Sequence, residues 1–179
     1  MSGGPAAPGG EGGSGGGIYS DSIGISNVLR NTLVALNSVN VGGLPGTNNG
    51  NGFLPGNPSI GNPGTNGVGP DVAGDFTSQK FNLIGMADGS LGLTNGVNAD
   101  QAGTVAAPVE PLLGPLQMNG GPTPTHALLT GSPAIDQGNS FGVHTDQRGL
   151  KRPYNFPNIS NPAGGDGGDI GAFELQPAL

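Results

Sequence analysis

Short hydrophobic runs interrupted by Ser, Asn and Gly dominate the segment 18–41. Ile23 and Ile25 show the two-residue alternation of a β-strand, and the same spacing returns at Leu33 and Ala35. Apolar residues do not recur at helical spacing for more than one turn, and no Glu–Lys pairs support a solvated helix face. The segment is therefore predicted to form strands. The polar residues at which the chain is expected to bend are Ser22, Asn27, Asn31 and Asn37.

Further along the chain, the pattern again favours extended structure. Residues 81–84 (FNLI) form the clearest apolar run of their region, and residues 169–176 (DIGAFELQ) read as a terminal strand. Between them, prolines recur at positions 108, 111, 115, 122, 124 and 133. Proline removes a backbone donor and disrupts a helix interior, so this spacing excludes long helices. The sequence predicts an all-β protein.

Glycine and proline divide the chain into regions. They contribute 38 and 17 of the 179 residues, a content that by itself favours disorder. Residues 1–17 hold nine glycines, and we expect a flexible tail there. Residues 42–70 are dominated by Asn-Gly and Asn-Pro turns, which predicts a loop insertion. The remainder, 18–179, is expected to be one domain.

The core of that domain must be narrow or stacked, because the chain has six Phe, two Tyr and no Trp. Short strands with small inward residues and Asn at bends are typical of a parallel β-helix, whose rung takes about 20 to 25 residues. The segment 18–41 has the length of one such rung. We therefore predict a few parallel β-helix rungs with an irregular Pro- and Gly-rich C-terminal cap.

The charge and cysteine content exclude several classes of function. A net charge of −7 argues against nucleic acid and anionic lipid as partners. Without cysteine there are no disulfides, Cys-based zinc sites or thiol catalysis. No apolar run approaches the roughly 20 residues of a membrane span, and the Met1 start lacks a signal-peptide pattern. If the protein is exported, we expect the signal to lie upstream or to have been removed.

Several motifs carry a resemblance to a known family. They are GGGIY (15–19), NTLVALN (31–37), GPDVAGDF (69–76), NLIG (82–85), LGPLQMNGGPTPTHALLTGSPAID (113–136), TDQRG (145–149) and DIGAFE (169–174). Together they resemble the choice-of-anchor Q domain of exported bacterial surface proteins. The resemblance implies a right-handed parallel β-helix and an extracellular or cell-surface location, but no reaction. The chain departs from the family in its long segment 42–68, in Met118 where an acid is usual, and in the lack of an anchor after Glu174.

Two groups of charged residues are candidate sites. The run GGDGGDIG fits most of a calcium-binding β-roll repeat, with Asp166 and Asp169 as possible oxygen ligands, although a plain turn is the simpler interpretation. Asp146 and Arg148 are expected to take part in a structural ion pair, in which the local bases hold the loop to an acid such as Asp136 or Glu174. An acidic sugar bound by these bases, beside Tyr154 and Phe156, is the alternative.

The other candidate residues favour structural roles. His126 is expected to be a hydrogen-bonded cap residue, and His144 near Ser132 and Ser140 matches no catalytic motif. The carboxylates Asp71, Asp75, Asp88, Asp100 and Asp136 are scattered along the chain, which weakens a polysaccharide-cleaving interpretation without excluding it. Stacked side-chain ladders are an option for Asn27, Asn31 and Asn37.

These observations favour a non-enzymatic structural or adhesion-type protein at the cell surface or outside the cell. A carbohydrate-binding or carbohydrate-cleaving β-helix is the alternative, with surface glycans as partners. The first rung of such a stack has an unpaired sheet edge. We therefore expect either upstream β-helix rungs or self-association through the ends of the stack.

Overall fold

The computed structural model describes residues 8–9, 14, 16–20, 27–39, 42, 44 and 63–177. This part of the chain is essentially all-β with parallel sheets, which confirms the all-β part of the predicted fold class. One turn of 3₁₀ helix, Val97–Ala99, interrupts the strands. The described residues contain no helix with the length and hydrophobicity needed to cross a bilayer.

The first sheet is built around strand β4 (Val72–Ser78). Strands β1 (Ile18–Ser20) and β2 (Asn27–Leu29) pair with its first and second halves, and β6 (Ser90–Leu91) also pairs with it. All of these pairings are parallel. Long connections must therefore return the chain to the same end of the sheet each time.

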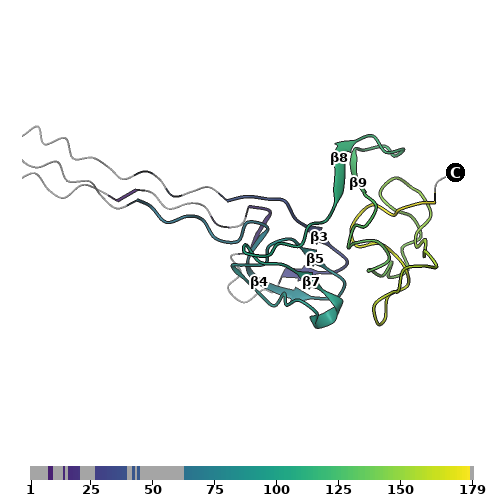
Figure 1. Ribbon diagram of the computed structural model, residues 1–179, viewed down its shortest axis with the longest axis horizontal. Coiled ribbons are helices and arrows are strands. Elements are labelled where there is room, and N and C mark those ends of the chain that lie inside the picture. Colours follow the sequence, from purple (N-terminus) through teal and green to yellow (C-terminus); the bar gives the residue numbers. More distant parts are fainter. Residues whose placement is uncertain are drawn as a thin grey trace, which may run out of the picture.

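The second sheet consists of β3 (Leu33–Val34), β5 (Leu83–Ile84) and β7 (Gln101–Ala102), again parallel and in that order. The chain thus crosses the first sheet and then the second three times, and each pass lies beside the preceding one (Figure 1). We call these the first, second and third pass. A strand is present at Leu33, and β5 covers the second half of the strand expected for 81–84. The strand expected around Ile23 and Ile25 lies outside the described residues.

A narrow core fills the space between the two sheets. It consists of Leu29, Val34, Val72, Phe76, Ile84 and Leu93. Phe76 is the one aromatic ring in this cluster, and the rest are aliphatic. The core is thus poor in aromatic rings, as the composition predicted, but it is made of branched aliphatic side chains, so the expectation of small inward residues is wrong for this cluster.

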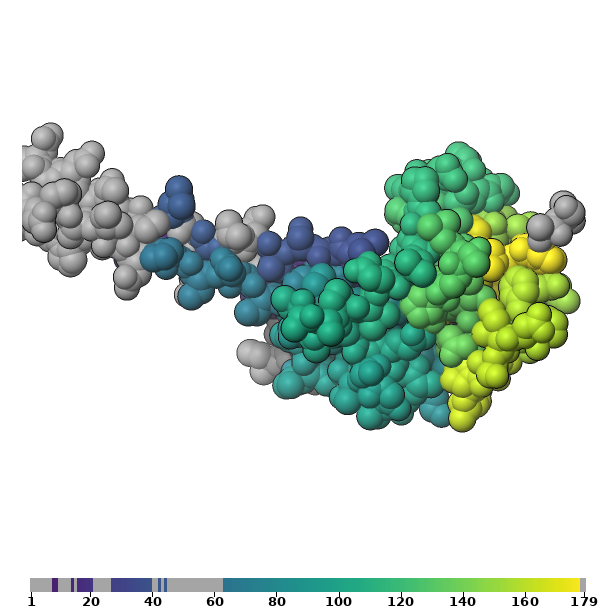
Figure 2. All heavy atoms as spheres, viewed as in Figure 1, coloured from purple at the N-terminus to yellow at the C-terminus, as the bar shows by residue number. Residues whose placement is uncertain are grey.

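The C-terminal segment covers the opposite face of the second sheet. Side chains alternate along a strand, so Leu33 and Leu83 point away from the core just described. They pack against the antiparallel hairpin of β8 (Leu113–Gln117) and β9 (Thr125–Leu128) and against the irregular chain that follows it. In Figures 1 and 2 this green-to-yellow segment stands beside the three passes.

A buried amide links the three passes. Asn82 Oδ1 accepts a hydrogen bond from Thr32 N at 3.1 Å, and Asn82 Nδ2 donates to Asp100 Oδ1 at 3.0 Å. The ladder suggested for Asn27, Asn31 and Asn37 was placed wrongly. These side chains bond instead to Ser20 Oγ, the Asp169 carbonyl and Asp71 Oδ1, respectively, because all three lie in one pass and cannot stack on each other.

Three extended stretches approach one another where they enter the first sheet. Gly16 N and Gly17 N donate to the carbonyls of Gly69 and Pro70, each at 3.1 Å. A Cβ at Gly16 would lie 2.3 Å from Pro70 O and 2.4 Å from Ser38 O, so no side chain fits there. The predicted tail and insertion otherwise lie largely outside the described residues, at 1–7, 10–13, 15, 43 and 45–62.

Gly16→Ala tests this close approach. We expect faster hydrogen exchange at the Ile18 amide, which donates to Asp71 O at 2.9 Å, because the added methyl must push the three backbones apart. Gly114→Ala is the matched control, since its Cβ would meet nothing closer than 3.6 Å. Equal exchange at Ile18 in both variants would contradict the packing.

Candidate functional site

Four buried carboxylates concentrate in the irregular C-terminal segment. Asp136, Asp169 and Glu174 are fully inaccessible to solvent, and Asp146 is nearly so. They come from the motifs PAID, TDQRG and DIGAFE. Carboxylates are rarely buried unless they are paired or hydrogen-bonded, so this cluster is the first candidate for a site.

Asp169 and Glu174 accept hydrogen bonds from backbone amides. Asp169 Oδ1 accepts from Asp136 N at 2.8 Å, and its Oδ2 accepts from Leu175 N at 2.6 Å. Glu174 Oε1 accepts from Tyr154 N at 2.7 Å, and its Oε2 accepts from Asp169 N at 3.0 Å. The terminal strand predicted for 169–176 is therefore wrong, because amides of this segment bond to carboxylates instead of a neighbouring strand.

Asp146 and Arg148 form a buried ion pair, with Arg148 Nη2 2.7 Å from Asp146 Oδ2. Asp146 also accepts from the backbone amides of Arg148 and Leu150 at 2.8 and 3.1 Å, and from Glu174 N at 3.1 Å. The Arg148 guanidinium carbon lies 3.6 Å from the centre of the Phe173 ring, a cation–π contact. The pair thus closes the TDQRG turn onto the segment that contains Glu174.

Arg152 supplies the second buried cation. Its Nε lies 3.3 Å from Glu174 Oε2, Nη1 donates to Gly171 O at 2.7 Å, and Nη2 donates to Asp169 O. Of the two acids suggested as partners for the local bases, Glu174 is thus reached by Arg152. Asp136 Oδ2 instead accepts from Phe156 N at 2.8 Å.

The burial of these groups changes their acidity. Burial raises the pKa of Asp169 to about 7, with a further contribution from the charges of Glu174 and Asp136. Burial also raises the pKa of Asp136 and of Glu174 above their ordinary values. For Asp146 burial acts in the same direction, but hydrogen bonds from Arg148 and from backbone amides outweigh it and lower the pKa.

The carboxylate network has the features of a structural element. Shifted pKa values are common among catalytic acids and bases, but such groups must also reach a substrate. Asp136, Asp169 and Glu174 have no solvent contact, and each accepts at least one backbone amide. The arrangement fixes the path of an irregular chain.

Asp166 and Asp169, the candidate calcium ligands, accept hydrogen bonds from different parts of the chain. Asp166 Oδ1 accepts from Ser140 N and Gly168 N, each at 3.0 Å, and Asp166 Oδ2 accepts the Ser140 hydroxyl. The oxygens of Asp169 are occupied in the network above. Within the described ranges, no group of three or more His, Asp or Glu side chains is arranged to hold a metal ion.

The histidines and serines considered for catalysis hydrogen-bond to different partners and not to one another within the described residues. His126 Nδ1 is 2.7 Å from Gly114 O, within the hairpin, and His144 is exposed. Ser132 Oγ donates to Pro111 O at 2.6 Å, and the Ser140 hydroxyl donates to Asp166. Both hydroxyls are therefore engaged in hydrogen bonds within the fold.

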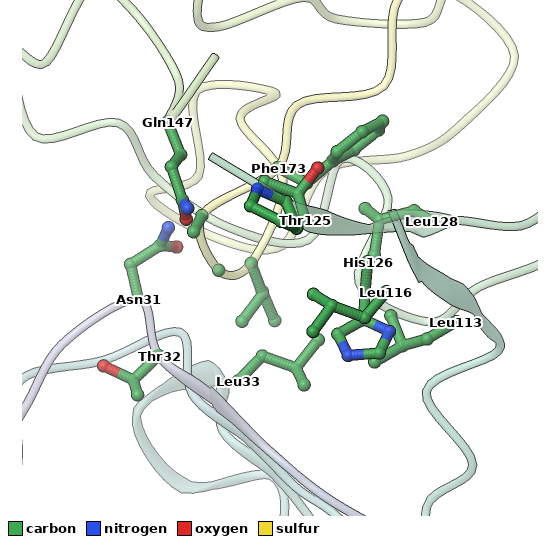
Figure 3. A pocket seen from close by; sticks show the side chains of 14 residues that line it. Asn31, Thr32, Leu33, Leu113, Leu116, Thr125, His126, Leu128, Gln147 and Phe173 are labelled. Atoms are coloured by element: carbon green, nitrogen blue, oxygen red, sulfur yellow. The ribbon is translucent and has the colours of Figure 1, made fainter. Parts of the chain in front are cut away.

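An apolar groove of about 540 Å³ lies between the first pass and the hairpin (Figure 3). Leu33 forms one wall, Leu113 and Leu116 of the hairpin form another, and Ile170 and Phe173 lie at the C-terminal side. Figure 2 shows the blue residues of the first pass next to the green hairpin. The sequence did not reveal this groove, because its walls come from distant segments that only the fold brings together.

Comparisons of the chain with protein-family models, with curated proteins and with solved structures gave no match.

The raised carboxyl pKa values predict an unusual pH dependence of stability. A raised pKa means that the folded chain binds more protons than the unfolded chain between the two values, here from about 3.8 to about 7 for Asp169. We therefore expect the melting temperature to rise as the pH is lowered from 7 towards 4. Below that range it should fall, because Asp146, with its lowered pKa, then becomes protonated.

Asp169→Asn should flatten the rise, whereas Asp75→Asn, at an exposed position of β4, should preserve it. Thermal unfolding followed by circular dichroism provides the measurement. A wild-type melting temperature that increases steadily from pH 4 to 7 contradicts the assignment.

Removal of the buried cation is expected to be costly. Arg152→Gln leaves Glu174 without its ionic partner and removes donors to the Asp169 and Gly171 carbonyls. We expect a loss of about 3–5 kcal/mol in the free energy of unfolding in urea. The neighbouring exposed Lys151→Gln should change it by about 0.5 kcal/mol or less. Equal effects of the two variants would show that the Arg152 contacts do not stabilise the fold.

Proposed function

We propose that this protein is a non-enzymatic structural protein of the bacterial cell surface or extracellular space, built as the end of a right-handed parallel β-helix. The three passes are the rungs, and the C-terminal segment is a lateral cover. The parallel register of β3, β5 and β7 and the narrow core between the sheets support this proposal. The bacterial and extracellular assignments rest on the resemblance to the choice-of-anchor Q domain.

The open edge of the first pass is the observation that carries the proposal. Leu83 N and Gly85 N donate to the carbonyls of Thr32 and Val34, each at 2.9 Å. Carbonyls of successive residues in a strand point to opposite sides, so the N–H and C=O of Leu33 point away from β5. In the part of the chain that the structure describes, no strand pairs with that outer edge.

The groove continues from this edge. The hairpin and the Ile170–Phe173 chain line the groove beside Leu33. Gly171 N donates to Asn31 O at 3.1 Å, so within the described residues the backbone without a strand partner begins at Leu33. A further strand placed there would gain main-chain hydrogen bonds from Leu33 and bury apolar side chains against Leu116. We propose that a second copy of the chain supplies this strand, so that the protein self-associates.

A non-enzymatic role agrees with the state of the titratable groups. The carboxylates with shifted pKa values are buried and hydrogen-bonded to the main chain, and the hydroxyls of Ser132 and Ser140 are engaged as well. Chemistry on a substrate requires such groups to face a cleft. Carbohydrate binding without cleavage is compatible with this fold, and a separate surface hollow lined by Arg30 and Lys80 favours it.

Self-association is tested by sedimentation velocity over a wide range of protein concentrations. The wild-type chain should form larger species as the concentration rises. Leu116→Lys, which adds a charge to the exposed groove wall, should remain monomeric. Val143→Lys is the control, since Val143 is similarly exposed but does not line the groove, and it should associate like the wild type. A wild-type monomer at all concentrations contradicts the proposal.

A further inference from the structure

A second hollow, of about 460 Å³, lies where the three passes meet the C-terminal segment. Arg30 follows β2 of the first pass, Gln79 and Lys80 follow β4 of the second, and Asn98 belongs to the 3₁₀ turn of the third. Phe141 comes from the C-terminal segment. Every part of the fold thus contributes a side chain.

The hollow collects cations in an acidic chain. The protein has only five Lys and Arg residues against twelve Asp and Glu. Arg148 and Arg152 are paired with buried acids, whereas Arg30 and Lys80 are exposed and have no acidic partner among the described residues. Two of the three remaining cations therefore face one hollow, which favours an anionic ligand.

An aromatic ring lies beside these cations. Phe141 is 41% exposed, and the Arg30 guanidinium carbon lies 4.7 Å from its ring centre. The buried Phe81 also packs against this ring, with the ring centres 6.0 Å apart and the ring planes tilted by 59°. The contact with Phe141 restricts the position of the Arg30 head group. The exposed part of Phe141 offers apolar ring surface to the C–H groups of a sugar.

The side-chain amides of Gln79 and Asn98 complete the lining of the hollow. The side chains of Gln79 and Asn98 are exposed and make no hydrogen bond within the described residues. Asn139, in contrast, is used internally, because its Nδ2 donates to Gly164 O at 2.8 Å and its Oδ1 accepts from Phe141 N at 2.6 Å. Asn139 therefore positions the ring. Gln79 and Asn98 offer donors and acceptors that suit hydroxyl groups.

The backbone around the hollow adopts uncommon conformations. Lys80, Phe81, Asn98 and Phe141 have φ values of 80°, 56°, 57° and 50°, the left-handed region that side chains other than glycine rarely adopt. Backbone strain of this kind clusters at ligand-binding sites. Among the described residues, four of the nine non-glycine residues with a positive φ line this hollow.

We propose that this hollow binds a uronic acid residue of an acidic polysaccharide. The carboxylate pairs with Arg30 and Lys80, hydroxyl groups bond to Gln79 and Asn98, and the apolar face of the sugar contacts Phe141. An acidic peptide would use the cations but has no need of the amide groups and ring together. This inference is independent of self-association, because neither Leu33 nor Leu116 lines the hollow.

The test is isothermal titration calorimetry of the full chain with oligogalacturonate. Binding should weaken at least about tenfold in Arg30→Gln and in Lys80→Gln, since each loses a charge-assisted contact. Phe141→Ala should also weaken it. Lys151→Gln removes an exposed cation outside the hollow and should bind like the wild type. Circular dichroism of each variant verifies that it is folded.

Three results would overturn the proposal. The first is no binding of oligogalacturonate to the wild type, and the second is binding that Arg30→Gln and Lys80→Gln leave unchanged. The third is equally tight binding of poly-glutamate or inorganic phosphate, which would show a plain anion site. A neutral oligogalactose should bind more weakly than oligogalacturonate. Leu116→Lys should bind like the wild type, so that a failure of self-association is distinguishable from a failure of this site.

Discussion

The hydrogen bonds between buried carboxylates and backbone amides are the interaction on which the rest of the structure depends. The chain after β9 has almost no strand pairing, yet it must cover Leu83 and the outer face of the second sheet. Asp169 and Glu174 supply acceptors for amides that a neighbouring strand would otherwise satisfy. Without them, the cover would leave buried polar backbone groups unpaired, at a cost comparable to a lost hydrogen bond for each group.

This form of stabilisation carries a penalty that the structure partly offsets. Burial disfavours the charged carboxylates, which raises the pKa of Asp169 and of Glu174. Arg152 lies against Glu174 and also donates to main-chain carbonyls, so one cation stabilises both the acid and the turn beside it. Hydrogen bonds to charged groups are strong and directional. They define one path for an irregular chain where hydrophobic contacts alone would permit several.

The sequence predicted the all-β class, the strand at Leu33 and part of the strand in 81–84, because alternation is a local property. It failed for 169–176, where an apolar pattern suited a strand but Asp169 and Glu174 took over the hydrogen bonding. Asp146 and Arg148 are only two residues apart, so their ion pair could be predicted from the sequence. The hollow that contains Arg30 and Phe141 could not be predicted from the sequence, because only the stacking of the three passes brings its residues together.

The most direct test of the network is amide hydrogen exchange of Tyr154, Phe156 and Leu175, followed by NMR. These amides lie outside every strand, but each donates to a buried carboxylate at 2.6 to 2.8 Å. The account predicts that they exchange as slowly as the amides of β5 and that Arg152→Gln removes much of this protection. Exchange at the rate of an unstructured loop in the wild-type protein would contradict it.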